Sequence, residues 1–285
     1  MEQQPQIAPA ASQQAQADPL NATLLERRDL TDELAIFRIQ PDSGQVAPFL
    51  PGQYTSLGLM ETEEEAAARP SRTGRPTRPK LILRAYSIAS SPKVRDYLEF
   101  FLVLVKEGAL TPKLWRLREG DRLYVSPKIT GKFTLEKVPP GRDLVMVATG
   151  TGLAPYVSML HTYRDTGLWR RVVVIHGTRL AADLAYRQEL EQIAREDKSV
   201  VYIPTVTREP EGSPWQGMRG RVNTLLDPDR YHELVGSPLT PDQCHVFLCG
   251  NPDMIDQVAA NLQQRGFVPR DRENPHGNIH FERYW

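Results

Sequence analysis

Cysteine is scarce in this chain, and the side chains that commonly bind metals are not grouped. The 285 residues include two cysteines, Cys244 and Cys249, within one apolar stretch. They cannot form a disulfide framework or a CxxC pair for zinc or a cluster, and the six histidines show no ligand spacing. We therefore predict no metal site, and this cysteine usage fits a reducing cytoplasm.

The chain also lacks an excess of either charge and any long apolar segment. Its 35 basic and 35 acidic residues give a formal net charge of zero, which argues against a dedicated nucleic-acid binder. Leu144–Leu160 is the longest mostly apolar run, but glycines and a proline interrupt it, so no membrane helix is predicted. Residues 1–21 are rich in Gln, Ala and Pro, which predicts a disordered tail and not a secretory signal.

The pattern of apolar residues along the chain changes near Pro139–Gly141. Before this point, short alternating runs separated by turn residues predict an antiparallel β-barrel over residues 22–138. The expected strands are Thr23–Leu30, Leu34–Gln40, Gln53–Leu59, Lys80–Ile88, Leu98–Val105 and Asp121–Ser126, with a short helix near Thr111-Pro112. Residues 61–79 carry an acidic run and then scattered arginines. We expect a mobile, solvated insertion there in preference to a docking arm.

After that point, fully apolar runs alternate with helical stretches over residues 139–285. This pattern is typical of a parallel sheet that is covered by helices on both faces. The runs are Leu144–Ala148, Val172–His176, Val200–Val206 and Val246–Cys249, and the clearest amphipathic helices are Leu184–Arg195 and Asp253–Arg265. We predict an α/β domain with a five-stranded parallel sheet.

The segment Arg84-Ala85-Tyr86-Ser87 combines a cation, a phenol and a hydroxyl at the end of an apolar strand. An arginine can pair with a pyrophosphate through two parallel hydrogen bonds. Tyr86 lies on the same strand face as Arg84, where its ring can lie against a flavin, and Ser87 can donate to the flavin N5 region. The alternative is an ordinary Arg–Tyr pair at a barrel edge.

The next strand and the turn after it extend this interpretation. Phe101 and the backbone of Val103 and Val105 could line a flat cofactor. The segment Gly108-Ala109-Leu110-Thr111 places backbone N–H groups and a hydroxyl at a helix start, which suits a phosphate. An ordinary helix cap is the alternative.

A glycine-rich turn and a cysteine follow two of the apolar strands in the second half. Gly150 and Gly152 permit a sharp turn and a close approach by a pyrophosphate at a helix N-terminus. This turn is not GxGxxG, and a purely structural turn is the alternative. Cys249 ends a strand just before Gly250–Met254, where it could touch a nicotinamide or be a core cysteine.

No acidic residue that could bind a ribose hydroxyl stands at the end of the second parallel strand, and Arg179 is there instead. Arg179 follows that strand, Arg208 follows the third, and Arg221 lies in Arg219-Gly220-Arg221. Guanidiniums that converge there would bind the 2′-phosphate of NADPH and disfavour NADH. The alternative for each of them is an ordinary surface arginine.

Together, the motifs R-A-Y-S, G-x-L-[ST]-P, A-T-G-T-G-x-A-P and C-G-N-P-x-M, with a terminal Tyr-Trp, resemble those of bacterial ferredoxin–NADP⁺ reductases. The resemblance covers about Thr23–Trp285 and implies an FAD-binding barrel, an NADP-binding domain, and ferredoxin or flavodoxin as partner. It assigns to FAD the residues Arg84, Ala85, Tyr86, Ser87, Phe101, Ala109, Leu110, Thr111, Thr151, Tyr284 and Trp285. It assigns to NADP the residues Gly150, Gly152, Thr178, Arg179, Thr207, Arg208, Arg221, Gly250, Asn251, Pro252, Asp253 and Met254.

The predicted reaction is hydride transfer between NADPH and the flavin, coupled to one-electron exchange with a small carrier. Tyr86, Ser87 and Cys249 are the residues expected nearest the chemistry, in a monomeric cytoplasmic enzyme. By charge alone, the arginines of the insertion could dock an acidic carrier; they include Arg72, Arg75 and Arg78. Alternatives are an NADPH-dependent reductase component serving an oxygenase or another acceptor, a free-flavin or quinone reductase, and a non-catalytic redox sensor.

Overall fold

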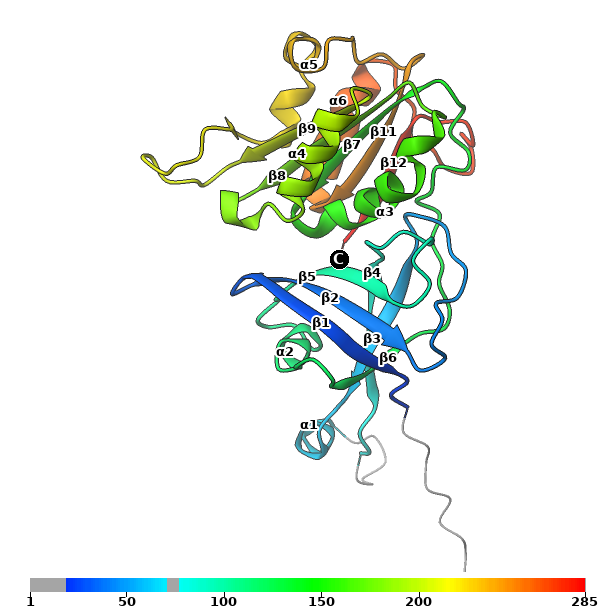
Figure 1. Ribbon diagram of the computed structural model, residues 1–285, viewed down its shortest axis with the longest axis vertical. Coiled ribbons are helices and arrows are strands. Elements are labelled where there is room, and N and C mark those ends of the chain that lie inside the picture. The colour runs from blue at the N-terminus through cyan, green and yellow to red at the C-terminus, as the bar shows by residue number, and fades with distance from the viewer. Residues whose placement is uncertain (1–18, 71–76, 285) are drawn as a thin grey trace, which may run out of the picture.

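The computed structural model describes residues 19–70 and 77–284, whose elements form two units, one above the other in Figure 1. Residues 1–18, 71–76 and 285 lie outside the described part, and with them most of the expected tail, Arg72, Arg75 and Trp285. Within the described residues, no helix has both the length and the apolar character that crossing a membrane requires.

The first unit is an antiparallel sheet of six strands in the order β4-β3-β6-β1-β2-β5, which confirms the predicted barrel. Its elements are β1 (Ala22–Thr31), β2 (Leu34–Pro41), β3 (Tyr54–Met60), β4 (Leu81–Ser87), β5 (Leu98–Val103), α2 (Thr111–Leu114) and β6 (Arg122–Val125). Leu24, Phe37 and Leu57 are fully buried in the apolar cluster inside this sheet. The strands β4 and β5 stand at the two ends of the order and meet at an isolated bridge between Ile88 and Phe100.

The second unit is a parallel sheet of six strands, one more than expected, in the order β10-β9-β8-β7-β11-β12. Its strands are β7 (Asp143–Thr149), β8 (Arg171–Thr178), β9 (Val200–Val206), β10 (Met218–Arg219), β11 (Cys244–Gly250) and β12 (Ile279–Arg283). The four apolar runs named from the sequence are β7, β8, β9 and β11, so neither edge strand of the sheet was located. β10 has two residues, and β12 mixes apolar with charged side chains, so neither is a continuous apolar run.

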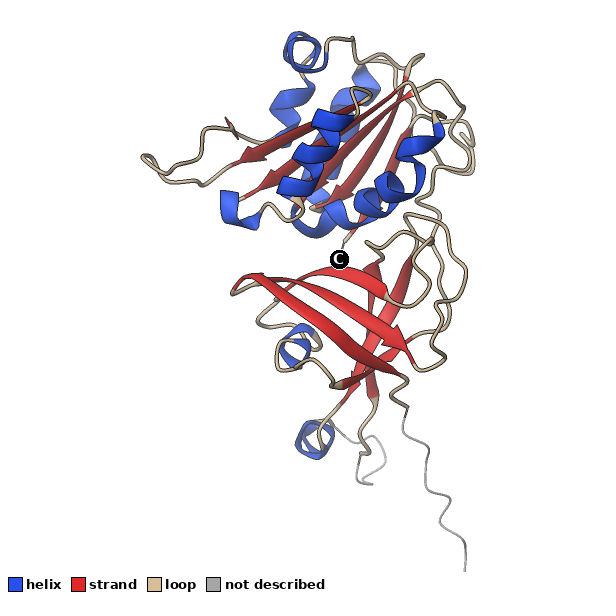
Figure 2. Cartoon of the chain, viewed as in Figure 1, coloured by secondary structure: helices blue, strands red, loops and turns tan. Residues whose placement is uncertain are grey.

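Helices cover both faces of the parallel sheet, as predicted (Figure 2). One face carries α3 (Ala154–Tyr163) and α4 (Arg187–Glu196), and the other carries α5 (Pro228–Val235) and α6 (Pro252–Gln264). Neighbouring β7 residues alternate between the two faces, because Met146 packs with the first pair of helices and Val145 with the second. The side chains of Asp227 and Asn251 accept hydrogen bonds from the first turns of α5 and α6, each directly before a proline.

The segment 61–79, which we expected to be a loop, contains a capped helix, α1 (Glu63–Ala68). The Thr62 hydroxyl accepts a hydrogen bond from the N–H of Glu65, and the Glu65 carboxylate accepts one from the N–H of Thr62. The same carboxylate lies 2.5 Å from Nζ of Lys113 in α2, which ties the insertion to the barrel. A helix this short has little apolar periodicity, so the feature of the sequence that could have predicted it is the Thr-x-x-Glu capping box.

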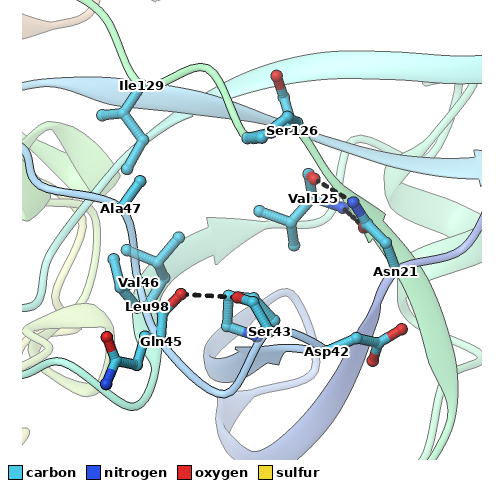
Figure 3. Close-up of a pocket in the computed structure, with 12 residues that line it drawn as sticks. Asn21, Asp42, Ser43, Gln45, Val46, Ala47, Leu98, Val125, Ser126 and Ile129 are labelled. Carbon is cyan, nitrogen blue, oxygen red and sulfur yellow. Dashed lines mark hydrogen bonds between the residues drawn. The ribbon is translucent and has the colours of Figure 1, made fainter.

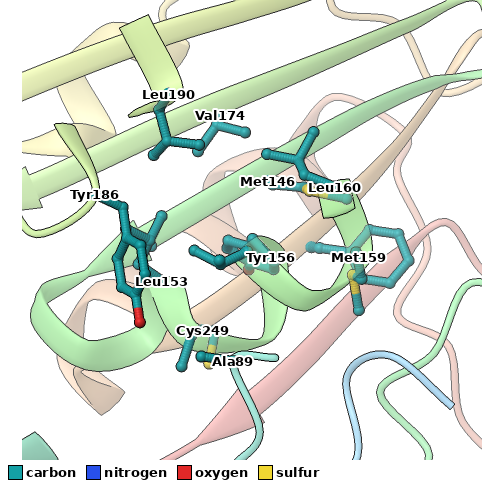
Figure 4. Close-up of a cluster of buried hydrophobic side chains, with 14 of the residues drawn as sticks. Ala89, Met146, Leu153, Tyr156, Met159, Leu160, Val174, Tyr186, Leu190 and Cys249 are labelled. Atoms are coloured by element: carbon teal, nitrogen blue, oxygen red, sulfur yellow. The ribbon is translucent and has the colours of Figure 1, made fainter. Parts of the chain in front are cut away.

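A buried apolar cluster joins the two units, so they share part of their core (Figure 4). Ala89 and Phe101 come from the antiparallel unit, and Tyr156 comes from α3 of the parallel unit. Beside this cluster, the Ser158 hydroxyl donates a hydrogen bond of 2.7 Å to the backbone oxygen of Ser90. The relative placement of the two sheets is therefore fixed by specific contacts.

Candidate functional site

The edge strand β4 carries exposed apolar side chains on one face and an exposed cation on the other. Leu83 is 41% exposed, and Arg84 and Ala85 are exposed as well. The Arg84 guanidinium donates a hydrogen bond of 2.7 Å to the carbonyl of Leu83, and it forms no ion pair with another described residue. Tyr86 packs against the barrel core, and burial raises the pKa of its phenol to about 12, so the ring stays neutral. The strand suits a flat ligand with an anionic group.

The end of β4 meets the last strand of the chain through a pair of polar side chains. The Ser87 hydroxyl donates a hydrogen bond of 3.0 Å to Oε2 of Glu282 in β12. Burial raises the pKa of the Glu282 carboxyl to about 7, and the hydrogen bond from Ser87 opposes that rise. Glu282 can therefore exchange a proton near neutral pH. Sequence reasoning missed this residue; its signal is an acidic side chain just before the terminal aromatics.

Tyr284 and Cys249 lie beside this pair. The Tyr284 N–H donates to the backbone oxygen of Gly250 over 3.4 Å, and its hydroxyl lies 3.5 Å from the backbone oxygen of Thr151. Burial raises the pKa of the Tyr284 phenol well above its ordinary value, and Cys249 is the next largest influence on it. Burial likewise raises the pKa of the Cys249 thiol, which is therefore neutral. Side chains from three segments, the end of β4, β11 and the residues from β12 to Tyr284, thus converge between the two sheets.

The glycines of the predicted nucleotide turn have different structural reasons. Gly150 has a φ of 53° and open space where a side chain would project, so a ligand can approach its backbone. A Cβ on Gly152 would lie 2.3 Å from the backbone oxygen of Cys249, so this glycine lets the turn after β7 pack against β11. Gly250, with a φ of 123°, allows the matching turn before α6. The Asn251 N–H then donates to the Thr149 hydroxyl over 2.9 Å.

The predicted phosphate-binding arginines follow neighbouring strands at the carboxyl edge of the parallel sheet. The N–H of Arg208 donates to the backbone oxygen of Arg179 over 2.8 Å, and the N–H of Thr207 donates to that of Thr178 over 3.1 Å. Arg221 follows β10, which pairs with β9. All three arginine side chains are exposed, and none forms an ion pair with another described residue. This edge can therefore bind a dianion.

Other predicted FAD residues are engaged within the fold. Phe101 is buried, with its ring edge-on to that of Tyr186 at a centroid distance of 5.9 Å. Leu110 belongs to the barrel core. The Thr111 hydroxyl both accepts from the N–H of Val105 and donates to its carbonyl, at 3.0 Å each. Ala109 is exposed beside them, whereas Trp285 lies outside the described residues.

A cavity of about 310 Å³ lies elsewhere on the barrel (Figure 3). Asn21, Asp42, Val46, Val125 and Ile129 are among the residues that line it. No residue predicted to bind FAD or NADP lines this cavity, so it is separate from the site between the sheets.

Comparison with known proteins places the chain in a family. Residues 146–260 match the family model described as oxidoreductase NAD-binding domain. The chain is 30% identical over 269 residues to a flavodoxin/ferredoxin–NADP reductase of Escherichia coli (94% of this chain, 100% of that protein). It is 34% identical over 241 residues to a ferredoxin–NADP reductase of Azotobacter vinelandii (81% of this chain, 85% of that protein).

A solved structure gives the same answer. The structure of a ferredoxin NADP⁺ reductase from Neisseria gonorrhoeae with bound FAD and NADP matches with a TM-score of 0.77 and 26% identity, over 94% of this chain and 100% of that one. The resemblance drawn from the sequence motifs is thereby confirmed. The chain belongs to the flavodoxin/ferredoxin–NADP reductase family.

Proposed function

We propose that this protein is a ferredoxin (flavodoxin)–NADP⁺ reductase that binds FAD along β4 and NADP(H) at the carboxyl edge of the parallel sheet. One observation carries the proposal. Ser87, Cys249, Glu282 and Tyr284 converge where the end of β4 meets the carboxyl ends of the strands of the parallel unit, which we call the nucleotide unit below. Two cofactors held by these surfaces would meet at that point, as direct hydride transfer requires.

The described residues fit FAD in charge and shape. The Arg84 guanidinium is available for a pyrophosphate, and the half-buried Tyr86, on the same face of β4, offers an aromatic surface for a ring system. When bound, FAD accepts a hydride and releases electrons one at a time. Ala85, Phe101, Ala109, Leu110, Thr111 and Thr151 complete the proposed FAD site, together with Tyr284 and Trp285.

The residues at the meeting point would orient the reactants and supply a proton. The Ser87 hydroxyl holds the Glu282 carboxyl in place, and that carboxyl gains or loses a proton near pH 7 because of its burial. Cys249 is fully buried and neutral, and Tyr284 beside it is a neutral ring. A nicotinamide could pack against the Tyr284 ring, and it would reach the Cys249 thiol only if the residues that cover the thiol moved.

NADP(H) would bind along the carboxyl edge of the parallel sheet. Arg179, Arg208 and Arg221 would hold the 2′-phosphate, with Thr178 and Thr207 beside them. Gly150 and Gly152 would border the pyrophosphate, and the segment Gly250-Asn251-Pro252-Asp253-Met254 would border the nicotinamide half. This segment opens the 13-residue helix α6, whose N-terminal dipole favours negative charge.

We further propose a barrel domain over residues 22–138, a nucleotide domain over 139–285 and a monomer in the cytoplasm, where two buried, unpaired thiols are compatible with a reducing environment. An acidic ferredoxin or flavodoxin would be the carrier. Of the arginines of the insertion, Arg78 flanks α1, which lies at the end of the barrel away from the parallel sheet in Figure 1. Basic residues nearer the meeting point are therefore better docking candidates.

The test is to purify the protein with FAD and to follow electron transfer from NADPH and NADH to ferricyanide, and then to ferredoxin and flavodoxin. We expect a yellow protein that prefers NADPH and reduces at least one of the two carriers. A colourless or inert protein would contradict the proposal. If the protein reduces ferricyanide but neither ferredoxin nor flavodoxin, the result would instead support a reductase component for an oxygenase or another acceptor.

A further inference from the structure

Tyr186 of the nucleotide unit has a rare backbone conformation, and its side chain reaches a residue of the barrel. Tyr186, directly before α4, has a φ of 58°, and it is the one non-glycine residue with positive φ among those described. This left-handed conformation is disfavoured for a residue that carries a Cβ, so contacts of the side chain must maintain it. The Tyr186 side chain is buried at the junction of the two units (Figure 4).

The Tyr186 hydroxyl contacts a buried carboxylate of the barrel. It donates a hydrogen bond of 2.9 Å to Oε1 of Glu99 in β5, whose side chain is 8% exposed. Nε of Arg38 lies 2.8 Å from the other carboxylate oxygen, and the Arg38 side chain is 36% exposed. The tyrosine hydroxyl is therefore one of two groups that compensate a buried charge. A buried carboxylate that loses a donor is costly.

Tyr186 and Glu99 each lie close to a segment of the proposed site. In the nucleotide unit, Tyr186 lies seven residues after Arg179, and η3 (Ala181–Asp183) between them contacts β1. In the barrel, the N–H of Glu99 donates to the Ser90 hydroxyl over 3.0 Å, and Ser90 lies three residues after Ser87. The contact thus connects the phosphate-binding edge to the strand that ends at the proposed reaction point.

We propose that Tyr186 and Glu99 form a positioning pair that locks the nucleotide unit against the barrel and sets the approach of the nicotinamide to the flavin. The effect on hydride transfer rests on the proposed function, whereas the effect on the arrangement of the two units does not. Neither side chain is assigned a contact with a cofactor. Their role is exerted through the segments that carry Arg179 and Ser87.

Tyr186→Phe tests the pair because it removes the hydroxyl and keeps the ring against Phe101. Tyr202→Phe is the matched control, since its hydroxyl lies 3.5 Å from His176 within the nucleotide unit. We expect Tyr186→Phe to slow flavin reduction by NADPH about tenfold, because a displacement of about 1 Å at the reacting atoms can cost ~10²-fold. Binding of 2′-phospho-AMP, which does not reach the flavin, should stay unchanged in both variants.

A second readout is independent of FAD and of activity. Spin labels at Leu25→Cys in the barrel and Leu168→Cys in the nucleotide unit occupy exposed positions, and the native cysteines are fully buried. The distance distribution between the labels should broaden in Tyr186→Phe and stay narrow in Tyr202→Phe. Glu99→Gln, which weakens the same contact from the other side, should broaden it as well.

Unchanged distance distributions in Tyr186→Phe and Glu99→Gln would overturn the positioning pair, and so would equal slowing of flavin reduction in Tyr186→Phe and Tyr202→Phe. If the wild-type protein were not reduced by NADPH at all, the proposed function would fail. A broadened distribution in Tyr186→Phe would still support the locking contact in that case.

Discussion

At the residue scale, the properties of the site depend on how burial changes ionisable side chains. Glu282 is half-buried beside Ser87 and has a pKa near 7, whereas Tyr86, Tyr284 and Cys249 have raised values that keep them neutral. One group of this set is therefore able to exchange protons under physiological conditions. The others contribute surfaces and dipoles.

We predict that Glu282→Gln removes a pH dependence of stability. The carboxyl pKa is raised from 4.5 to about 7 in the fold, so the contribution of its neutral form is complete below about pH 4.5. It is lost as the pH rises through about 7. The glutamine stays neutral and can still accept from Ser87. Urea unfolding of both proteins between pH ~5 and ~8 measures this difference, and parallel profiles would show that burial does not perturb Glu282.

A second prediction concerns NADPH selectivity. Arg179→Ala together with Arg208→Ala should raise the KM for NADPH by about 10²-fold and leave that for NADH nearly unchanged, since each charged hydrogen bond contributes ~1.5–3 kcal/mol. Steady-state kinetics with both nucleotides measure the effect. Arg230→Ala is the control, because Arg230 pairs with Glu233 on α5. Equal losses for NADPH and NADH would contradict the phosphate assignment.

The site residues that can be predicted from the sequence are those whose chemistry lies in one short segment. Arg84, Tyr86 and Ser87 lie within one run of four residues, and each arginine of the proposed phosphate site follows a recognisable strand or turn. Glu282 is different, because it meets Ser87 from 195 positions away. Its pKa depends on that contact and on burial, and neither can be predicted from the residues next to it in the sequence.

At the scale of elements, the two strand-to-helix turns of the nucleotide unit support each other. The turn after β7 packs on the turn after β11 at Gly152, and Thr149 binds the N–H of Asn251. The long apolar strands and the amphipathic helices are predictable because their periodicity is strong. The helix α1 and the edge strands β10 and β12 are too short or too mixed in composition to give that signal.

We predict that Gly152→Ala separates these turns. The added Cβ would lie 2.3 Å from the Cys249 carbonyl oxygen, and backbone must move to relieve that contact. Overpacking of this kind costs roughly 1–3 kcal/mol of unfolding free energy, and it should also slow flavin reduction. Gly236→Ala, at an open position with a φ of 73°, is the comparison. It should cost ~1 kcal/mol without changing the rate, and a similar rate for the two variants would contradict the role of Gly152.

At the scale of the whole molecule, several histidines are buried in neutral form on the parallel sheet. Burial lowers the pKa of His176 and His245 to about 4 and that of His280 to about 3. His245 and His280 face each other at 3.0 Å, and the His280 ring stacks on Phe247. The folded chain therefore resists protonation that the unfolded chain accepts.

The expected consequence is loss of stability in mild acid. These pKa values lie below the ordinary value of 6.5, so the stabilising contribution is complete above about pH 6.5 and is lost as the pH falls toward 4. His280→Phe, which keeps a flat ring on Phe247, should reduce the slope of the unfolding free energy against pH. Unfolding free energies at pH ~7 and ~5 measure it. An unchanged slope in the variant would mean that His280 is protonated in the fold.

The central claim is that the two cofactor surfaces meet at Ser87, Cys249, Glu282 and Tyr284, and anaerobic rapid mixing tests it most directly. The FAD-loaded protein is mixed with NADPH carrying deuterium at the transferable C4 position, and then with oxidised ferredoxin or flavodoxin. We predict that the flavin absorbance bleaches more slowly than with unlabelled NADPH and recovers when a carrier is added. A flavin that stays bound but is not reduced by NADPH would contradict the account.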